Sequence, residues 1–192
     1  MVYWIIYFST KVLSWLYFPF TAYNTRKIPR QGGFILASNH ISNLDPMLLG
    51  ICSVRRLNFM AKIELFKGIL GFILVRLGSF PVRRGEADFG AMREALKRLK
   101  MGRPVLIFVE GTRRIGDAPS KAQSGVGFLA MKSGVPIVPV YIKGTDKVMA
   151  PGTKSLKRDR VFTTFGDPFY VNDAPSYEEA SQRILDKIYA LA

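Results

Sequence analysis

The sequence is poor in the residues from which disulfides and zinc sites are built. It contains one cysteine, Cys52, and one histidine, His40, in 192 residues. A single cysteine excludes a disulfide within the chain, which fits a reducing compartment. One cysteine and one histidine also cannot supply the ligands of a Cys/His zinc site. The sequence shows no carboxylate cluster either, so we expect no bound metal.

Acidic residues are also scarce. Asp and Glu number 14 against 28 Lys and Arg, which gives a formal net charge of +14. The excess is largest in residues 55–114, which hold fourteen basic and five acidic side chains. A basic surplus of this size indicates an anionic partner, which is a phosphate on a substrate, a lipid surface or nucleic acid.

Apolar material is abundant by contrast, at 48% of residues, which excludes a disordered chain, and the length suits one domain. Runs that predict strands are residues 33–38, 57–61, 104–109, 137–142 and 161–165, while 79–82 suits a strand or a turn because it contains Pro81. Segments that predict helices are residues 62–77, 88–100 with Asp88 as cap, 125–132, and a last one opened by a capping box of Ser176 and Glu179. This alternation predicts an α/β layered domain with a largely parallel central sheet flanked by helices.

Residues 1–20 form a separate, strongly apolar segment, MVYWIIYFSTKVLSWLYFPF. As a helix it would be about 30 Å long, close to the thickness of a bilayer core. Lys11 near its centre and the even spread of its aromatic residues favour a helix lying in one interface over a spanning helix. Basic residues at 26, 27 and 30 follow, which places the rest of the chain on the cytoplasmic side if the segment inserts. We therefore predict an N-terminal membrane-associating helix within a segment 1–25, followed by one domain over 26–192. A helix packed on the domain's own core is the alternative.

His40 follows the predicted strand 33–38, in the sequence Asn-His-Ile-Ser-Asn-Leu-Asp that ends at Asp45. The carboxyl ends of strands in α/β sheets are where sites are usually built. A neutral imidazole accepts a proton near pH 7, and a carboxylate can hold its other ring nitrogen. The spacing therefore favours His40 as a general base and Asp45 as the residue that orients it. The pair alone is a weak motif, and a histidine that merely satisfies a loop is the alternative.

Basic side chains recur where other predicted strands end. Lys62 follows the strand 57–61, Arg83 and Arg84 follow 79–82, and Glu110-Gly111-Thr112-Arg113 follows 104–109. Guanidinium groups bind phosphate through paired hydrogen bonds, and a glycine allows the backbone to approach a ligand closely. Each cation alone is typical of a solvated surface, but their recurrence at strand ends favours an anion site. Cys52 lies in an apolar context, which favours a buried thiol over a nucleophile.

Five segments in this order, NHISNLD, K-x-E-L at 62–65, GSFPVRR, FVEGTRR and VPIVPV, resemble the lysophosphatidate acyltransferase type of glycerolipid acyltransferases. The resemblance covers about residues 30–145. It implies transfer of an acyl group from a thioester to the free hydroxyl of 1-acyl-glycerol-3-phosphate, giving phosphatidate. It assigns catalysis to His40 and Asp45. The residues that it assigns to the acceptor phosphate are Lys62, Arg84, Glu110, Gly111, Thr112 and Arg113.

The sequence departs from the family pattern at three positions. Members commonly have Pro where Val109 stands, Ser where Arg114 stands, and Asp or Asn where Arg83 stands. The acceptor therefore stays open between lysophosphatidate, glycerol-3-phosphate and a lysolipid without phosphate. The acyl donor is acyl-CoA or an acyl group carried by acyl carrier protein, and no metal or redox cofactor is implied.

The expected partners are a phospholipid membrane, a lysophospholipid acceptor and an acyl thioester donor, with acyl carrier protein as one carrier. A non-catalytic basic module that binds a membrane or nucleic acid is the alternative from another class. We expect no nucleic acid, because the basic residues form no recognised binding motif with interleaved aromatic residues.

Overall fold

The computed structural model describes residues 5, 7–9, 11–12, 14, 18–83, 88–113, 121–153 and 155–192. Within these residues seven strands form one sheet, in the order β1-β7-β6-β2-β5-β3-β4. The strands are β1 Phe20–Tyr23, β2 Ile35–Ser38, β3 Asn58–Lys62, β4 Ser79–Val82, β5 Val105–Phe108, β6 Ile137–Lys143 and β7 Val161–Phe165. Neighbouring strands pair in parallel except β6 and β7, which are antiparallel. The predicted α/β fold with a largely parallel sheet is confirmed.

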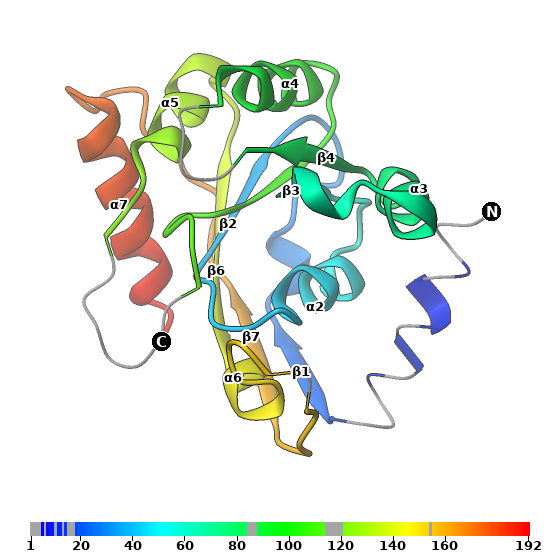
Figure 1. Cartoon of the computed structure of the whole chain (residues 1–192). Helices are drawn as coiled ribbons and strands as arrows, with labels where there is room; N and C mark the ends of the chain where they lie inside the picture. Colours follow the sequence, from blue (N-terminus) through cyan, green and yellow to red (C-terminus); the bar gives the residue numbers. More distant parts are fainter. Residues whose placement is uncertain are drawn as a thin grey trace.

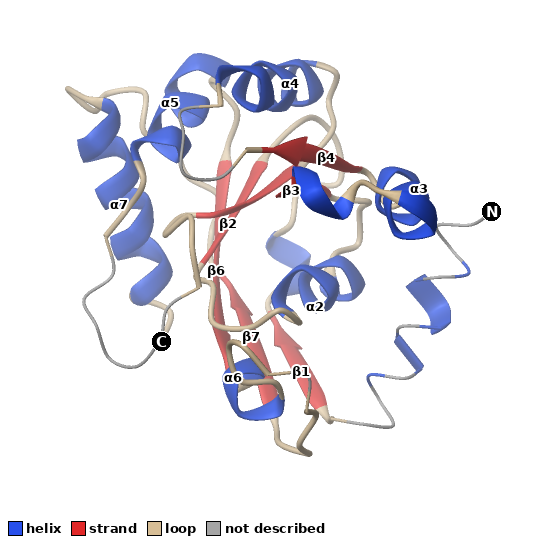
Figure 2. Cartoon of the chain, in the orientation of Figure 1, coloured by secondary structure: helices blue, strands red, loops and turns tan. Residues whose placement is uncertain are grey.

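Helices cover both faces of this sheet (Figures 1 and 2). The helical segments are η1 Thr25–Lys27, α2 Asp45–Cys52, η2 Ile63–Leu65, α3 Gly68–Arg76, α4 Phe89–Lys100, α5 Ser124–Ser133, α6 Thr145–Val148 and α7 Tyr177–Tyr189. Helix α2 lies on one face, and α4, α5 and α7 lie on the other. Helix α3 lies beside the edge strand β4.

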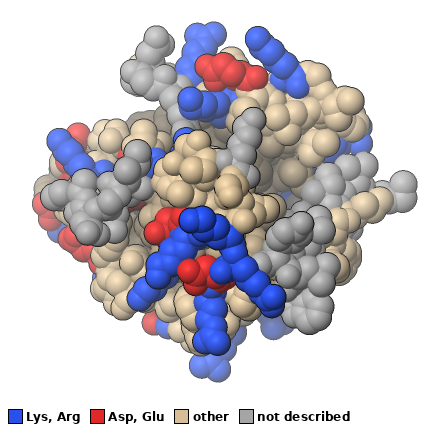
Figure 3. All heavy atoms as spheres, turned by 60° about the horizontal axis from the view of Figure 1, so that its bottom comes forward, with Lys and Arg blue, Asp and Glu red and all other residues tan. Residues whose placement is uncertain are grey.

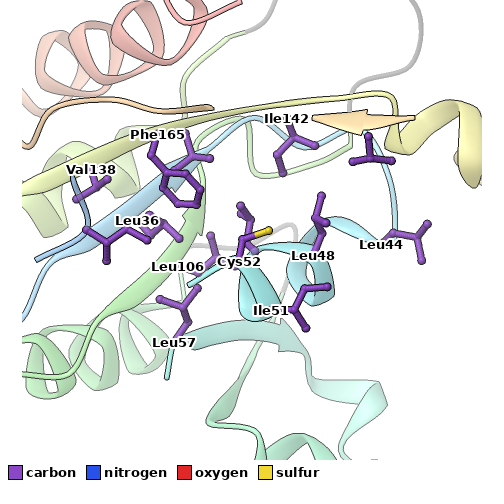
Figure 4. Close-up of a cluster of buried hydrophobic side chains, with 14 of the residues drawn as sticks. Leu36, Leu44, Leu48, Ile51, Cys52, Leu57, Leu106, Val138, Ile142 and Phe165 are labelled. Carbon is purple, nitrogen blue, oxygen red and sulfur yellow. The ribbon is translucent and has the colours of Figure 1, made fainter. Parts of the chain in front are cut away.

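The central strand β2 is buried on both faces because helices cover it from both sides. Leu36 points into the cluster beneath α2, where Leu48, Cys52 and Phe165 meet (Figure 4). Ile35 and Ala37 point into the second cluster, beneath α4, α5 and α7. This arrangement fixes the direction in which β2 delivers the residues that follow it.

Four elements, β1, η1, α2 and α6, were not predicted from the sequence. Strand β1 lies within the apolar segment 1–25 and pairs in parallel with β7, so the sheet begins before residue 26. Helix α2 begins at Asp45, and Pro46 occupies its first turn, where the missing N–H has no helical partner to lose.

The single helix predicted over residues 62–77 is wrong in its extent. Lys62 ends β3, residues 63–65 form the short helix η2, and α3 begins only at Gly68. Lys67 is extended, and Gly68 has a φ of 55°, a left-handed conformation that glycine adopts without strain. These two residues interrupt the helix although the apolar pattern continues through them.

The two predicted helix caps are confirmed. The Asp88 carboxylate accepts the backbone N–H of Ala91 at 2.9 Å, and the Ser176 hydroxyl accepts that of Glu179 at 3.1 Å. Hydrogen bonds from the backbone N–H groups of Arg83 and Ala91 hold the pKa of Asp88 below its usual range.

Candidate active site

Strands β2 to β6 run parallel to one another, so their carboxyl ends lie at one edge of the sheet. The ends of β2, β3, β5 and β6 each deliver a residue of the candidate site. These residues are His40 after β2, Lys62 at the end of β3, Arg113 after β5 and Thr145 after β6. The structure therefore brings to one edge of the sheet residues that are up to 105 positions apart in the sequence.

His40 and Asp45 form a buried hydrogen-bonded pair. The imidazole Nδ1 lies 2.7 Å from Asp45 Oδ2, and the two residues are 4% and 0% exposed. The same carboxylate oxygen accepts the backbone N–H groups of Ile41 at 2.7 Å and Ser42 at 2.8 Å. Because this oxygen already accepts two N–H groups, it acts as an acceptor toward Nδ1 as well. His40 then carries its proton on Nδ1 and leaves Nε2 free to accept a proton from a substrate.

Thr145 completes the surroundings of this carboxylate. Its hydroxyl donates to Asp45 Oδ1 at 2.6 Å from the first turn of α6, one hundred residues further along the chain. Both carboxylate oxygens are therefore held, and the side chain of Asp45 is fixed. No local pattern pointed to Thr145, because its contact with Asp45 arises only when β6 lies beside β2.

The imidazole of His40 is held from two further sides. Phe108 at the end of β5 stacks on the ring, with centroids 3.9 Å apart and planes 15° from parallel. The backbone N–H of His40 donates to Glu110 Oε2 at 2.9 Å, and the Tyr189 hydroxyl donates to Glu110 Oε1 at 2.7 Å. Glu110, predicted to bind substrate, thus links the base to the last turn of α7. Tyr189 was not identified from the sequence.

The polar residues around His40 also fasten its loop to the sheet. The Asn39 side chain exchanges two hydrogen bonds with the backbone of Ile142 on β6, at 2.9 and 2.7 Å. The Ser42 hydroxyl donates to the carbonyl of Met149 at 2.8 Å. The motif NHISNLD therefore specifies the shape of a loop as well as the buried pair of His40 and Asp45.

A cavity of about 680 Å³ opens beside this pair. Its polar lining includes His40, Lys62 and Arg113. Its other walls are apolar and come mainly from α2, β3 and α3, including Met47, Ile51, Phe59, Leu70 and Leu74. The cavity therefore combines a base, two cations and an apolar space large enough for part of a lipid.

Arg113 is tied to the loop of His40, because its guanidinium donates to Asn43 Oδ1 at 2.7 Å. A second cavity, of about 340 Å³, is lined by Glu110, Gly111 and Thr112 and shares Phe59 and Met60 with the first. The structure thus divides the residues that were predicted to bind phosphate between two neighbouring cavities. Arg84 lies outside the described residues.

Gly111 makes the turn between these cavities possible. Its φ of 70° is left-handed, and a Cβ at this position would lie 2.8 Å from Cγ of Gln123. The glycine therefore lets the chain turn directly after β5, so that Glu110 lines the second cavity and Arg113 lines the first.

Cys52 faces the core, as predicted. It is hydrogen-bonded to Thr163 at 3.8 Å, and burial raises the pKa of its thiol to about 11. A thiol in this state is a poor nucleophile near neutral pH.

Lys and Arg side chains gather on the face that lies at the bottom of Figure 1, as Figure 3 shows. Helix α6 and the loop after it lie on this side. The exposed basic residues here are Lys143 at the end of β6 and, in α6 and the loop after it, Lys147, Lys157, Arg158 and Arg160. Positive charge therefore surrounds the element that carries Thr145.

Comparisons with known proteins show the family to which this α/β domain with its buried His–Asp pair belongs. The sequence profile of the acyltransferase family matches residues 19–143. The chain is 30% identical over 153 residues to the 1-acyl-sn-glycerol-3-phosphate acyltransferase of Bacillus subtilis, covering 79% of this chain and 74% of the relative. It is 32% identical over 126 residues to the lyso-ornithine lipid O-acyltransferase of Pseudomonas aeruginosa, covering 65% and 48%.

A solved structure is similar as well. The 1-acyl-sn-glycerophosphate acyltransferase PlsC from Thermotoga maritima aligns with a TM-score of 0.81 and 26% identity, over 96% of this chain and 76% of that chain. The chain therefore belongs to the acyltransferase family. Within it, the chain is an enzyme of the 1-acylglycerol-3-phosphate acyltransferase type, and the resemblance inferred from its motifs is confirmed.

Proposed function

We propose that the protein transfers an acyl group from a thioester to the free hydroxyl of 1-acyl-glycerol-3-phosphate, giving phosphatidate, with His40 as general base. The observation that carries this proposal is the 2.7 Å contact between His40 Nδ1 and Asp45, at the edge of a cavity with two cations and apolar walls. The cations suit a phosphate, and the apolar walls suit acyl chains.

A thioester is already activated, so the reaction needs no acyl-enzyme. His40 Nε2 takes the proton of the acceptor hydroxyl as its oxygen attacks the thioester carbonyl. The tetrahedral intermediate then collapses with cleavage of the carbon–sulfur bond, and the imidazolium returns the proton to the leaving thiolate. Asp45 stabilises the imidazolium and keeps the ring oriented. Base catalysis of this kind contributes about 10²–10⁴-fold, and positioning of the two substrates supplies much of the rest.

Lys62 and Arg113 are the described cations best placed for the acceptor phosphate, since both line the cavity of His40. The planar guanidinium of Arg113 offers paired, charge-assisted hydrogen bonds to phosphate. Arg84, Gly111 and Thr112 remain predicted to bind substrate, although Gly111 and Thr112 line the second cavity. Glu110 supports it indirectly, through the backbone of His40.

The acyl donor is acyl-CoA or an acyl group carried as a thioester by acyl carrier protein. The basic surface around α6 suits either carrier, because the phosphates of CoA and the acidic surface of a carrier protein are both anionic. Parallel assays with the same acyl group on the two carriers distinguish them. The preferred carrier gives the higher kcat/KM.

The N-terminal segment supports association with a membrane. Ile5, Phe8 and Val12 are exposed and lie one helical turn apart, while Tyr7 faces the protein and donates to the carbonyl of Ile51 at 3.1 Å. Among the described residues, no helix is long and apolar enough to cross a membrane. We propose that this segment lies in one interface, with the domain on the cytoplasmic face. Replacing these three apolar residues by Ser should move the protein from the membrane fraction toward the soluble one.

An acceptor without phosphate is the second candidate, because one relative is named as a lyso-ornithine lipid acyltransferase. Incubation with an acyl thioester and a panel of lysolipids, followed by lipid analysis, tests both candidates. We expect phosphatidate from lysophosphatidate and little product from glycerol-3-phosphate or lysolipids that lack phosphate. Preference for an acceptor without phosphate would support the second candidate. No product from any acceptor would support a non-catalytic basic module.

A further inference from the structure

Helix α3, with the sequence GILGFILVR, is apolar around its whole circumference, yet only Gly71 in it is buried. One face carries Leu70 and Leu74, which line the cavity beside His40. The opposite face carries Ile69, Phe72 and Val75, which are 81%, 55% and 58% exposed. A helix that is apolar on all sides is normally surrounded by a protein core or by lipid. Protein covers only part of α3.

Basic side chains stand at both ends of this exposed face. Lys67 directly precedes α3 and Arg76 ends it, and both are exposed. The Arg76 guanidinium lies over the ring of Phe72, 4.5 Å from its centroid. Between residues 62 and 77 the chain has three basic residues and one acidic residue, Glu64. Apolar side chains flanked by cations are typical of a helix that lies in an anionic lipid interface.

The length of α3 agrees with that placement. Nine residues of helix extend over about 13.5 Å, far less than the hydrocarbon core of a bilayer. Two further exposed apolar residues, Ile63 and Leu65, lie on η2 directly before α3, whereas others, such as Phe89, Leu156 and Tyr170, lie singly on separate elements. Single exposed apolar residues are normal on a soluble surface, whereas a contiguous apolar face marks a site of interaction.

We propose that α3 is a membrane-docking surface, which inserts Ile69, Phe72 and Val75 into one leaflet of an anionic bilayer with Lys67 and Arg76 at the level of the phosphates. Because the opposite face of the same helix lines the cavity, docking places the cavity directly beside the leaflet. The acceptor lipid then reaches His40 from the bilayer without leaving an apolar environment. This consequence rests on the proposed function, whereas the docking itself does not.

The first test places an environment-sensitive dye on Ile69→Cys, with Phe89→Cys on α4 as the matched control, in the full chain. Cys52 is buried, and labelling of the unsubstituted chain measures its contribution. With vesicles of phosphatidylglycerol and phosphatidylcholine, we expect dye emission at position 69 to shift to the blue and resist quenching by iodide. Emission at position 89 should not change.

Two results would overturn the docking. One is a dye at position 69 that stays in water while the protein is bound to the vesicles through its N-terminal segment. The other is a blue shift that appears without vesicles as the protein concentration rises, because a second copy of the chain would then cover α3.

The second test measures vesicle binding of the double variant Ile69→Ser/Phe72→Ser against Phe89→Ser. We expect the partition coefficient of the double variant to fall at least about fivefold, since two apolar side chains no longer insert. Turnover of a short-chain, monomerically dispersed lysophosphatidate should stay within about twofold, because neither side chain lines the cavity. Unchanged vesicle binding would contradict the docking. Absence of turnover in the unsubstituted enzyme would instead contradict the proposed function.

Discussion

The loop that carries His40 and the helix α3 border the same cavity, yet they are built in opposite ways. In the loop, Asp45 is fully buried, and both of its carboxylate oxygens are hydrogen-bonded. Helix α3 carries apolar side chains on every side and leaves most of them exposed. The first arrangement fixes charged groups before the substrate arrives. The second leaves apolar surface for a partner to cover.

Under the two proposals, this difference separates the residues of acyl transfer from those of lipid binding. A buried, pre-oriented base needs no rearrangement when charge develops in the transition state. An exposed apolar helix contributes little to stability by itself but gains free energy when it meets lipid. Substitutions in the loop should therefore change turnover on every form of substrate. Substitutions on the outer face of α3 should change only the dependence on a lipid surface.

The largest effect is expected for Asp45→Asn. An amide can donate to Nδ1 and so favours the wrong tautomer of His40, while the N–H groups of Ile41 and Ser42 lose their charged acceptor. Turnover should fall by about 10²-fold or more, measured as kcat beside the thermal midpoint of unfolding. The control is Asp146→Asn on α6, whose carboxylate is exposed. A folded Asp45→Asn enzyme with ordinary kcat would remove the contrast between the two regions.

A smaller, acceptor-dependent effect is expected for Arg113→Ala. Loss of a bidentate phosphate contact should lower kcat/KM for lysophosphatidate by roughly tenfold, and Arg113→Lys should restore only part of it. With a lysolipid that lacks the phosphate, kcat/KM should be low for the unsubstituted enzyme and should fall little further in Arg113→Ala. Arg93→Ala on α4 serves as control because it is exposed outside the cavity. An equal loss with every acceptor would show that Arg113 acts only through its hydrogen bond to Asn43.

A few-fold effect is expected for Tyr189→Phe. This change removes the hydroxyl that donates to Glu110, which in turn holds the backbone of His40. We expect kcat to fall about fivefold with little change in KM, because a buried hydrogen bond of this kind contributes about 1 kcal/mol. Tyr170→Phe, at an exposed position, is the matched control. An increase in KM without a change in kcat would place Tyr189 in substrate binding instead.

The smallest effect concerns Cys52. Because burial raises the pKa of its thiol from 9.0 to about 11, the folded protein keeps a proton that the unfolded chain loses. Its contribution to stability is therefore complete below about pH 9 and is lost as the pH rises toward 11. At pH 8 a thiol reagent should react slowly with the folded protein and rapidly after unfolding. Rapid reaction of the folded protein would show that the region beneath α2 opens readily.

Elements with strong local signals were predicted well. The strand that became β5 is a short apolar run, and α4 and α7 begin at side chains that cap them. The pairing of His40 with Asp45 also follows from local spacing, because five residues span the end of one strand and the start of the next helix.

The remaining features depend on tertiary contacts that no local pattern encodes. Residues 62–77 read as one apolar helix, and only the backbone at Lys67 and Gly68 divides them. Thr145 and Tyr189 reach the site because β6 and α7 pack beside β2, at sequence separations of 100 residues and more. The exposure of α3 could not be predicted from the sequence either, because a helix of the same composition is also typical of a buried core.

The most direct test of the central claim is single-turnover acyl transfer by the unsubstituted enzyme and by His40→Ala. Both proteins are incubated with lysophosphatidate and an acyl thioester, and phosphatidate and free thiol are measured together. The account predicts equal amounts of the two products from the unsubstituted enzyme, and a rate at least about 10²-fold lower for a His40→Ala protein that melts normally. Phosphatidate formation at the ordinary rate by folded His40→Ala would contradict it.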